Sequence, residues 1–227
     1  MIYLVISNAI IVILIFLAML KFFDYRANER QLELLSVLTN AKDQYIVSHQ
    51  DHVAVLASLF YEHLPKEIKR VINKRKLIRA AKLHDIGKIF IDDSILAKTG
   101  KLTDDEYEQI KTHAYIGARI LNRTRHKDVA VFVNCHHERP DGLGYYKVLD
   151  TQIPIESKTI SICDTFSALT TARCYRPAPY SIPEALKIIE DVAGSQLDEI
   201  LVGYFLNIET KKLLAVDTML KGQYFVL

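Results

Sequence analysis

The pattern of apolar and polar residues begins with one long apolar segment. Between residues 2 and 20, Ser7 and Asn8 are the only polar residues. Nineteen helical residues extend roughly 28 Å, about the thickness of the hydrocarbon core of a bilayer. The cations that follow the segment are Lys21, Arg26 and Arg30, and none precedes it. Because cytoplasmic flanks are enriched in Lys and Arg, this pattern predicts a single transmembrane helix with the rest of the chain in the cytoplasm.

Two other structures contain apolar segments of similar length. A cleaved signal peptide has a positively charged first region and a small-residue cleavage site, and neither is evident before Lys21. A buried helix of a soluble fold has a polar stripe, which residues 2–20 lack. We therefore expect residues 1–22 to be an uncleaved single-pass anchor in the inner (cytoplasmic) membrane, with the amino terminus outside.

Helical periodicity dominates the remaining sequence. Leucines at positions 32, 34, 35 and 38 predict a juxtamembrane helix over residues 23–40, joined to the globular part without a flexible linker. Thr103–Glu106 and Ser181–Glu184 have the capping-box pattern of a helix N-terminus. We expect helices near residues 40–63, 67–85, 103–124, 127–137, 153–173, 182–193 and 197–207, and an extended tail at 224–227. The sequence thus predicts an all-α domain over residues 41–208 and a C-terminal extension over 209–227.

Composition narrows the class of protein. The 227 residues are 50% hydrophobic and 25% charged, which suits one core-forming domain with an appendage. The net charge of +2 gives no argument for binding a nucleic-acid polymer. The three cysteines, Cys135, Cys163 and Cys174, are an odd number without CxxC spacing, which disfavours both a disulfide framework and a thiolate zinc site. We expect reduced, mostly buried thiols.

Five histidines and two aspartates are candidate metal ligands. They are His49, His84, Asp85, His113, His136, His137 and Asp164. Imidazoles and carboxylates without a thiolate suit Mn, Fe or Zn in a hydrolytic site, and an aspartate beside a histidine can bridge two ions. Asp164 lies on an apolar helix face, where an unpaired carboxylate is costly to bury. A lone histidine is more often structural, which is our interpretation of His63 and His126.

Ordered motifs surround these residues. They are Leu83–Ile89 (LHDIGKI), Ile95–Thr103, Lys111–His113, His136–Tyr145 and Asp164–Arg176. Together they resemble an HD-GYP domain of the HD phosphohydrolase superfamily, in order from about Asp43 to Leu197, roughly two thirds of the chain. A bare His-Asp dipeptide is a weak signal, whereas this ordered series is a specific one.

The resemblance implies an HD-domain helical bundle that hydrolyses cyclic di-GMP, with linear pGpG as product. One ion would be held by His49, His84, Asp85 and Asp164, and the second by Asp85, His113, His136 and His137. A hydroxide activated by the two divalent ions would be the nucleophile. Asp85 would bridge the ions, and Lys88 would stabilise charge developing on the phosphate. Iron or manganese is expected before zinc, magnesium or nickel.

The resemblance also places substrate contacts at Tyr145, Arg173 and Arg176. Guanidinium groups suit phosphate oxygens and guanine edges. Tyr146 replaces the proline of the family signature, which puts the shape of this loop in doubt.

Other departures concern the ions and the cations around them. Tyr45 stands where members with a third metal carry a glutamate, so we expect two ions. His52 and Lys158 occupy usual arginine positions, and these changes could weaken contacts with substrate or effector.

Two alternatives to the cyclic di-GMP phosphodiesterase stay open. One is a catalytically silent module that binds the nucleotide or a protein, and the other is an HD phosphohydrolase acting on a different nucleotide. The complete ligand set favours an enzyme, because a silent module has no need of seven metal-binding side chains. The expected partners are cyclic di-GMP and, through residues 2–20, the membrane, while homodimer formation is left open.

Overall fold

The computed structural model of the protein describes residues 2–40, 49–171 and 178–224. The α-helices are α1 (Ile2–Asn40), α2 (His49–His63), α3 (Lys66–Val71), α4 (Lys74–Leu83), α5 (Asp93–Leu96), α6 (Asp104–Leu121), α7 (Ala130–Asn134), α8 (Ile155–Thr170), α9 (Ile182–Asp191), α10 (Glu199–Leu206) and α11 (Thr210–Tyr224). The 3-10 helices are η1 (Ile86–Phe90), η2 (Lys127–Val129) and η3 (Asp150–Gln152). Within the described ranges there is no strand, only an isolated bridge between Ala193 and Leu197. The all-α prediction is therefore confirmed for these residues.

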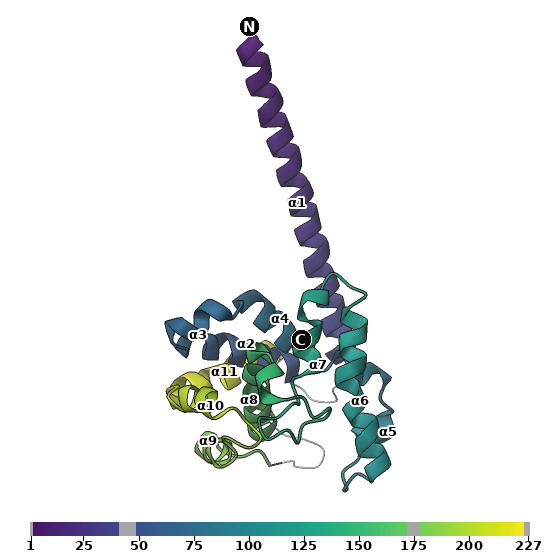
Figure 1. Ribbon diagram of the computed structural model, residues 1–227, viewed down its shortest axis with the longest axis vertical. Helices are drawn as coiled ribbons and strands as arrows, with labels where there is room; N and C mark the ends of the chain where they lie inside the picture. Colours follow the sequence, from purple (N-terminus) through teal and green to yellow (C-terminus); the bar gives the residue numbers. More distant parts are fainter. Residues whose placement is uncertain (1, 41–48, 172–177, 225–227) are drawn as a thin grey trace.

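Helix α1 has two different environments. Its first part projects away from the globular body, and its last part packs into it (Figure 1). Near the body, Leu32 and Leu35 pack against the core, while Ser36 and Thr39 are buried. Most of the large apolar side chains between residues 14 and 25 are exposed. In the part of the chain that the structure describes, no helix is both long enough and apolar enough to span a bilayer, so the predicted transmembrane helix has no support from the structure.

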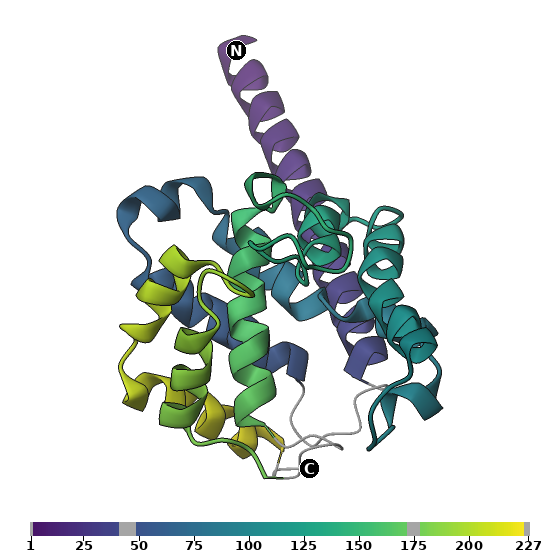
Figure 2. The same ribbon diagram turned by 60° about the horizontal axis from the view of Figure 1, so that its bottom comes forward.

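The globular body is built around α2, α4 and α8. Helix α2 packs against both α4 and α8, and α6 and α7 adjoin this centre on the side opposite α9, α10 and α11 (Figure 2). Phe60 of α2, Phe166 of α8 and Phe205 of α10 are fully buried. Phe205 meets Phe60 and Phe166 edge to face, with ring centroids 5.1 and 5.5 Å apart. This aromatic cluster fixes α2 beside α8, the two helices that carry His49 and Asp164.

Two predicted helices differ from the expectation: one is divided in two and the other is shorter. The segment near 67–85 is two helices, because Asn73 caps α4 by accepting a hydrogen bond from the backbone N–H of Lys76. The segment near 127–137 is shorter, because α7 ends at Asn134 and the next residues form a turn. Both predicted capping boxes, at Thr103–Glu106 and Ser181–Glu184, are confirmed.

The C-terminal segment contains a helix that the sequence pattern does not predict. Leu213 and Val216 of α11 are buried in the same core as the aromatic cluster. Tyr224 is the last residue of this helix, so its expected extended conformation is wrong, and residues 225–227 lie outside the described residues. Much of α11 is therefore packed on the domain, in contact with α2 and α9.

Close contact between η1 and α6 depends on glycine. A Cβ atom at Gly87 would stand 1.9 Å from the carbonyl oxygen of His113 and 2.7 Å from the backbone nitrogen of Gly117. Both neighbours are backbone atoms of a helix and cannot rotate away. Only glycine at position 87 lets the chain after Asp85 lie directly against the turn of α6 that carries His113.

We expect Gly87→Ala to separate η1 from α6 and to lower the free energy of unfolding by about 3 kcal/mol, because overpacking against backbone is not relieved by side-chain motion. Gly100→Ala is the matched control, since its Cβ would meet nothing within 4 Å. That control should change stability by less than about 0.5 kcal/mol. Urea unfolding of the two variants measures the difference, and equal stabilities would contradict the close-contact argument.

Candidate metal centre

The seven predicted ligands converge from separate helices. They are His49 at the start of α2, His84 and Asp85 directly after α4, His113 in α6, His136 and His137 directly after α7, and Asp164 in α8. Five of them are buried, and the other two, His137 and Asp164, are half-buried. Helix ends and helix faces thus bring together residues that lie as far as 115 positions apart in sequence.

The ligand atoms form two groups that share Asp85. The first contains Asp85, His113, His136 and His137, the second contains His49, His84 and Asp85, and within each group the atoms lie within 4.8 Å of one another. Asp85 Oδ1 lies 3.3 Å from His113 Nε2, and its Oδ2 lies 3.3 Å from His84 Nε2. Two atoms that bind one cation at about 2.1 Å lie roughly 3–3.5 Å apart. The spacing suits one cation on each side of the Asp85 carboxylate.

Asp164 adjoins the second group. Its Oδ1 lies 2.8 Å from His49 Nε2 and 3.9 Å from His84 Nε2. The hydrogen bond from His49 holds the pKa of Asp164 well below its usual value, although burial acts in the opposite direction. The carboxylate is therefore ionised and available to a cation.

Backbone carbonyls orient three of the rings in the same way. Nδ1 of His84 donates to Ala81 at 2.7 Å, Nδ1 of His113 to Ile110 at 2.7 Å, and Nδ1 of His136 to Val133 at 2.6 Å. Each acceptor is the carbonyl oxygen three residues earlier in the chain. When Nδ1 carries the hydrogen of a neutral ring, Nε2 keeps its lone pair. All three Nε2 atoms are thus prepared as ligands, in the manner of metal-binding histidines.

Burial keeps the first group of rings uncharged. It lowers the pKa of His113 to about 4 and that of His137 to about 3, and it lowers the pKa of His136 well below its ordinary value. Nε2 of His113 and Nε2 of His136 lie 3.4 Å apart. With both Nδ1 atoms protonated, these two nitrogens face each other as lone pairs, an arrangement that a shared cation stabilises.

Among the buried side-chain atoms that lack a hydrogen bond within the described residues, two belong to this centre. They are Nε2 of His84 and Oδ1 of Asp85. Burying a polar atom without a partner costs about 1–3 kcal/mol, and more for a charged group. A divalent cation would satisfy both atoms, so the residues present fit the metals that the sequence analysis expects.

Lys88 and two histidines that can carry positive charge surround the carboxylate of Asp85. Burial raises its pKa, but Lys88, His84 and His113 outweigh that effect and hold the pKa well below the usual value. Lys88 Nζ donates to Asp85 Oδ2 at 2.6 Å. For His84, burial lowers the pKa, yet the charges of Asp85 and Asp164 raise it overall. The structure therefore places Lys88 beside the carboxylate that both groups share.

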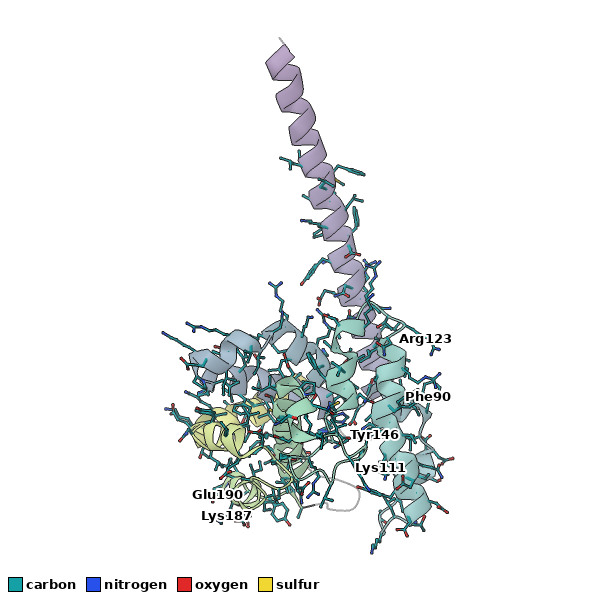
Figure 3. All side chains as sticks on the ribbon, in the orientation of Figure 1. Phe90, Lys111, Arg123, Tyr146, Lys187 and Glu190 are labelled. Atoms are coloured by element: carbon teal, nitrogen blue, oxygen red, sulfur yellow. The ribbon has the colours of Figure 1, made fainter. Side chains whose placement is uncertain are left out.

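The loop that carries the signature tyrosine is fixed by Glu138. This buried carboxylate accepts the backbone N–H of Tyr146 at 2.8 Å and that of Val148 at 2.9 Å. Tyr146 also donates its hydroxyl hydrogen to the carbonyl oxygen of Lys111 at 2.8 Å, and the two residues lie close together in Figure 3. Proline at position 146 has no N–H to donate. In this chain two hydrogen bonds from Tyr146 hold the loop where family members have a fixed proline.

A cleft of about 230 Å³ opens beside the first metal group. The residues that line it are Tyr107, His137, Arg139, Leu143, Gly144, Tyr145, Ser161, Thr165, Gln196 and Leu197. Tyr145 packs on the His137 ring at a centroid distance of 4.5 Å, and it lies perpendicular to the Tyr107 ring at a centroid distance of 6.2 Å. Tyr145 thus contacts the ring of a predicted ligand and also lines the cleft. The sequence assigns no role to Tyr107, which lies outside the motifs, or to Arg139, which lies within His136–Tyr145 but is not marked as a contact.

Four predicted residues lie either outside the described part of the chain or away from the cleft. Arg173, Arg176 and Tyr45 lie outside the described residues, so their predicted roles stay predictions. Lys158 makes ion pairs with Asp150 at 2.6 Å and Asp198 at 3.0 Å, away from the residues that line the cleft.

The expectation for the thiols is confirmed in part. Cys135 and Cys163 are free and buried, and burial raises the pKa of both. Cys174 lies outside the described residues.

Comparison with known proteins decides the family. The sequence matches the HD domain family over residues 33–201. This chain belongs to the HD domain family. The chain is 36% identical over 182 residues to a cyclic di-GMP phosphodiesterase of Thermotoga maritima, a match that covers 78% of this chain and 48% of the relative. It is 35% identical over 164 residues to a 3'3'-cGAMP-specific phosphodiesterase 3 of Vibrio cholerae, covering 71% of this chain and 35% of the relative.

Solved structures share the fold of the HD domain. A protein of Bdellovibrio bacteriovorus described as an HDG"Y"P protein superposes with a TM-score of 0.57 at 17% identity, covering 73% of this chain and 53% of that one. A cyclic GMP-AMP-specific phosphodiesterase of Vibrio cholerae gives 0.55 at 16% identity, covering 85% and 54%. The chain spans about half or less of the length of these curated relatives and structures. The resemblance to HD-GYP domains is thereby confirmed.

We expect Glu138→Ala to free the signature loop, because the amides of Tyr146 and Val148 lose their shared acceptor. Hydrogen exchange at these two amides should accelerate at least tenfold, which corresponds to about 1.4 kcal/mol of lost protection. Tyr146→Phe keeps both acceptors and should leave exchange at Val148 unchanged. Glu108→Ala, an exposed acid of α6, is the control. Unchanged exchange in Glu138→Ala would show that something else fixes the loop.

Proposed function

We propose that the protein is a metal-dependent phosphodiesterase that hydrolyses cyclic di-GMP to linear pGpG. The observation that carries the proposal is the pair of ligand groups joined through Asp85, next to a cleft lined by Tyr107, Tyr145 and Arg139. The geometry provides donors for two cations whose separation is set by one carboxylate. Such paired sites suit the cleavage of phosphodiesters, because both the attacking and the leaving oxygen need stabilisation.

The two ions would be divided according to the groups. One ion would bind to His49, His84, Asp85 and Asp164, and the other to Asp85, His113, His136 and His137. Bound divalent cations lower the pKa of coordinated water and neutralise phosphate charge. Nitrogen and oxygen donors without thiolate are compatible with iron or manganese and also with zinc.

The side chains around the centre would orient the substrate. Lys88 is about one third exposed, so its ammonium group can reach a phosphate as well as Asp85. The Tyr145 ring, packed on His137, offers a flat face to a base. Arg139 adds a guanidinium group to the cleft, although it is paired with Asp141. A cyclic dinucleotide presents phosphates and planar bases together, which matches this combination.

The relatives support the substrate class. Those named cyclic di-GMP phosphodiesterases and those named 3'3'-cGAMP-specific phosphodiesterases match this chain at similar identity. Both substrates are cyclic dinucleotides that contain guanine, so similarity alone does not separate them. We propose cyclic di-GMP because the motif series of this chain resembles the HD-GYP pattern.

The test is hydrolysis by the purified chain loaded with Mn²⁺ or Fe²⁺. Cyclic di-GMP, 3'3'-cGAMP and a cyclic mononucleotide are supplied at equal concentration, and products are separated by chromatography. We expect linear pGpG as the main product and cyclic di-GMP as the preferred substrate. His84→Ala combined with Asp85→Ala should abolish turnover and metal content while the helical circular dichroism persists. His63→Gln, a histidine outside the centre, should behave as the unmodified protein.

The possible outcomes separate the alternatives. Binding of cyclic di-GMP without turnover in any divalent metal would replace the enzyme by a silent binding module. Faster hydrolysis of 3'3'-cGAMP or of the mononucleotide would keep the metal centre and change the substrate. Turnover that survives the loss of His84 and Asp85 would refute the site itself.

We also propose that residues 2–20 attach the chain to the cytoplasmic membrane, with the HD domain in the cytoplasm. The support is the apolar sequence of this segment and the cations that follow it. The full chain should stay with the membrane pellet after carbonate extraction, and a chain without residues 2–20 should move to the supernatant. Recovery of the full chain in the supernatant would contradict the proposal.

A further inference from the structure

A series of buried polar contacts connects α11 to the metal centre. Ser167 Oγ of α8 lies 2.8 Å from Nδ1 of His49 and 2.9 Å from Nδ1 of His52. Nε2 of His52 lies 2.8 Å from Oδ1 of Asp217, which belongs to α11. Ser167 and His52 are buried, and Asp217 is only 14% exposed. The contacts therefore run from α11 through α2 and α8 to a predicted metal ligand.

The hydroxyl group between the two rings limits where their hydrogens can be. Ser167 has a single hydroxyl hydrogen, so it donates to only one of the two Nδ1 atoms. The other Nδ1 atom must then carry a hydrogen and donate it to Ser167 Oγ. The tautomers of His49 and His52 are thus linked, and whatever fixes one ring also fixes the other.

Asp217 determines which atom donates and which accepts at each contact between His52, Ser167 and His49. Because an ionised carboxylate only accepts hydrogen bonds, the nearby Asp217 favours a hydrogen on Nε2 of His52. In a neutral His52, Nδ1 then accepts the hydroxyl hydrogen of Ser167. Nε2 of His52 and Oδ1 of Asp217 lie 2.8 Å apart, but neither atom makes a hydrogen bond of regular geometry with any described group, so their contact is electrostatic. Ser167 Oγ then accepts from Nδ1 of His49. Nε2 of His49 also donates to Oδ1 of Asp164 at 2.8 Å in the metal-free chain, so it gives up this hydrogen when it binds a cation.

We propose that Asp217, His52 and Ser167 are positioning residues that hold His49 with Nε2 as its ligand nitrogen. His84, His113 and His136 obtain the same tautomer from backbone carbonyls, as described above. Nδ1 of His49 instead contacts a side chain, so its tautomer depends on residues from two other helices. The inference rests on the metal centre of the proposed function and is independent of the identity of the substrate.

Asp217 lies in a helix beyond the part of the chain that matches the HD domain family. The match to the HD domain family ends at residue 201, and α11 begins at Thr210. Leu213 and Val216 already fix α11 to the core through apolar contacts. A mostly buried carboxylate is not needed for that packing and carries a desolvation cost. Its contact with His52 is explained if α11 supports the metal centre.

The tautomer of His52 is measurable in the metal-free protein. Long-range ¹H–¹⁵N spectra of histidine-labelled full chain distinguish the two ring nitrogens, and the spectrum of His52→Gln identifies the signals of His52. We expect the hydrogen on Nε2 and an unprotonated Nδ1. A hydrogen on Nδ1 of His52 would reverse the direction of the series and overturn the proposal.

Metal affinity is the second measurement, by calorimetric titration of the full chain with Mn²⁺. Asp217→Ala and Ser167→Ala should each raise the Kd about 10–100-fold, the usual effect of losing a group that orients a ligand. The double variant should be no weaker than the more severe single variant, because both residues act through one series of contacts.

Leu213→Ala is the matched control, since it loosens α11 without touching the polar contacts. It should lower the Tm more than Asp217→Ala does, while leaving the Kd near that of the unmodified chain. An unchanged Kd in Asp217→Ala, or an equal loss of affinity in Leu213→Ala, would overturn the proposal.

The result also separates this inference from the proposed function. Normal Mn²⁺ affinity in the unmodified chain, its loss in Asp217→Ala, and no hydrolysis of cyclic dinucleotides would remove the proposed function alone. No Mn²⁺ binding by the unmodified chain would overturn both.

Discussion

The carboxylate of Asp85 is the group around which the whole centre is organised. It is 2% exposed, and its two oxygens face histidines from different groups. An ionised carboxylate at such a position is costly unless positive charge compensates it. Lys88 supplies one positive charge, and the rings of the first group supply none because burial keeps them neutral. The neutral rings keep their lone pairs beside an ionised carboxylate, so the fold offers a set of donors that suits cations.

This requirement explains several local features of the fold. Helix α4 ends at Leu83, which places Asp85 at a helix end rather than on a helix face. Glycine at position 87 then allows the chain to pass directly against α6, so that Asp85 meets His113. The packing of the aromatic cluster holds α2 beside α8 and brings His49 to Asp164. Each ligand is thus fixed by a packing contact that has no metal chemistry of its own.

The sequence predicts much of this arrangement, because its strongest signals are local. The His84–Asp85 and His136–His137 pairs and the two capping boxes are visible without tertiary structure, and the helical class follows from the periodicity. The roles of Ser167 and Asp217 are not visible, because they depend on which helices become neighbours. The sequence marks His52 only as a departure from a family arginine, whereas the structure places it against Ser167 and Asp217. Helix α11 escaped prediction because its apolar residues form no clear periodic stripe.

The substitution at position 146 shows why a departure from a motif need not disturb the site. A proline restricts a loop through its ring, which reduces the conformational freedom of the unfolded chain. Tyr146 instead restricts the loop in the folded state, through its backbone N–H to Glu138 and its hydroxyl to Lys111. The carboxylate of Glu138 also accepts from Val148, so one buried acid fixes both sides of the turn. Because the constraint comes from hydrogen bonds, the neighbouring Tyr145 keeps a defined position against His137 without the proline.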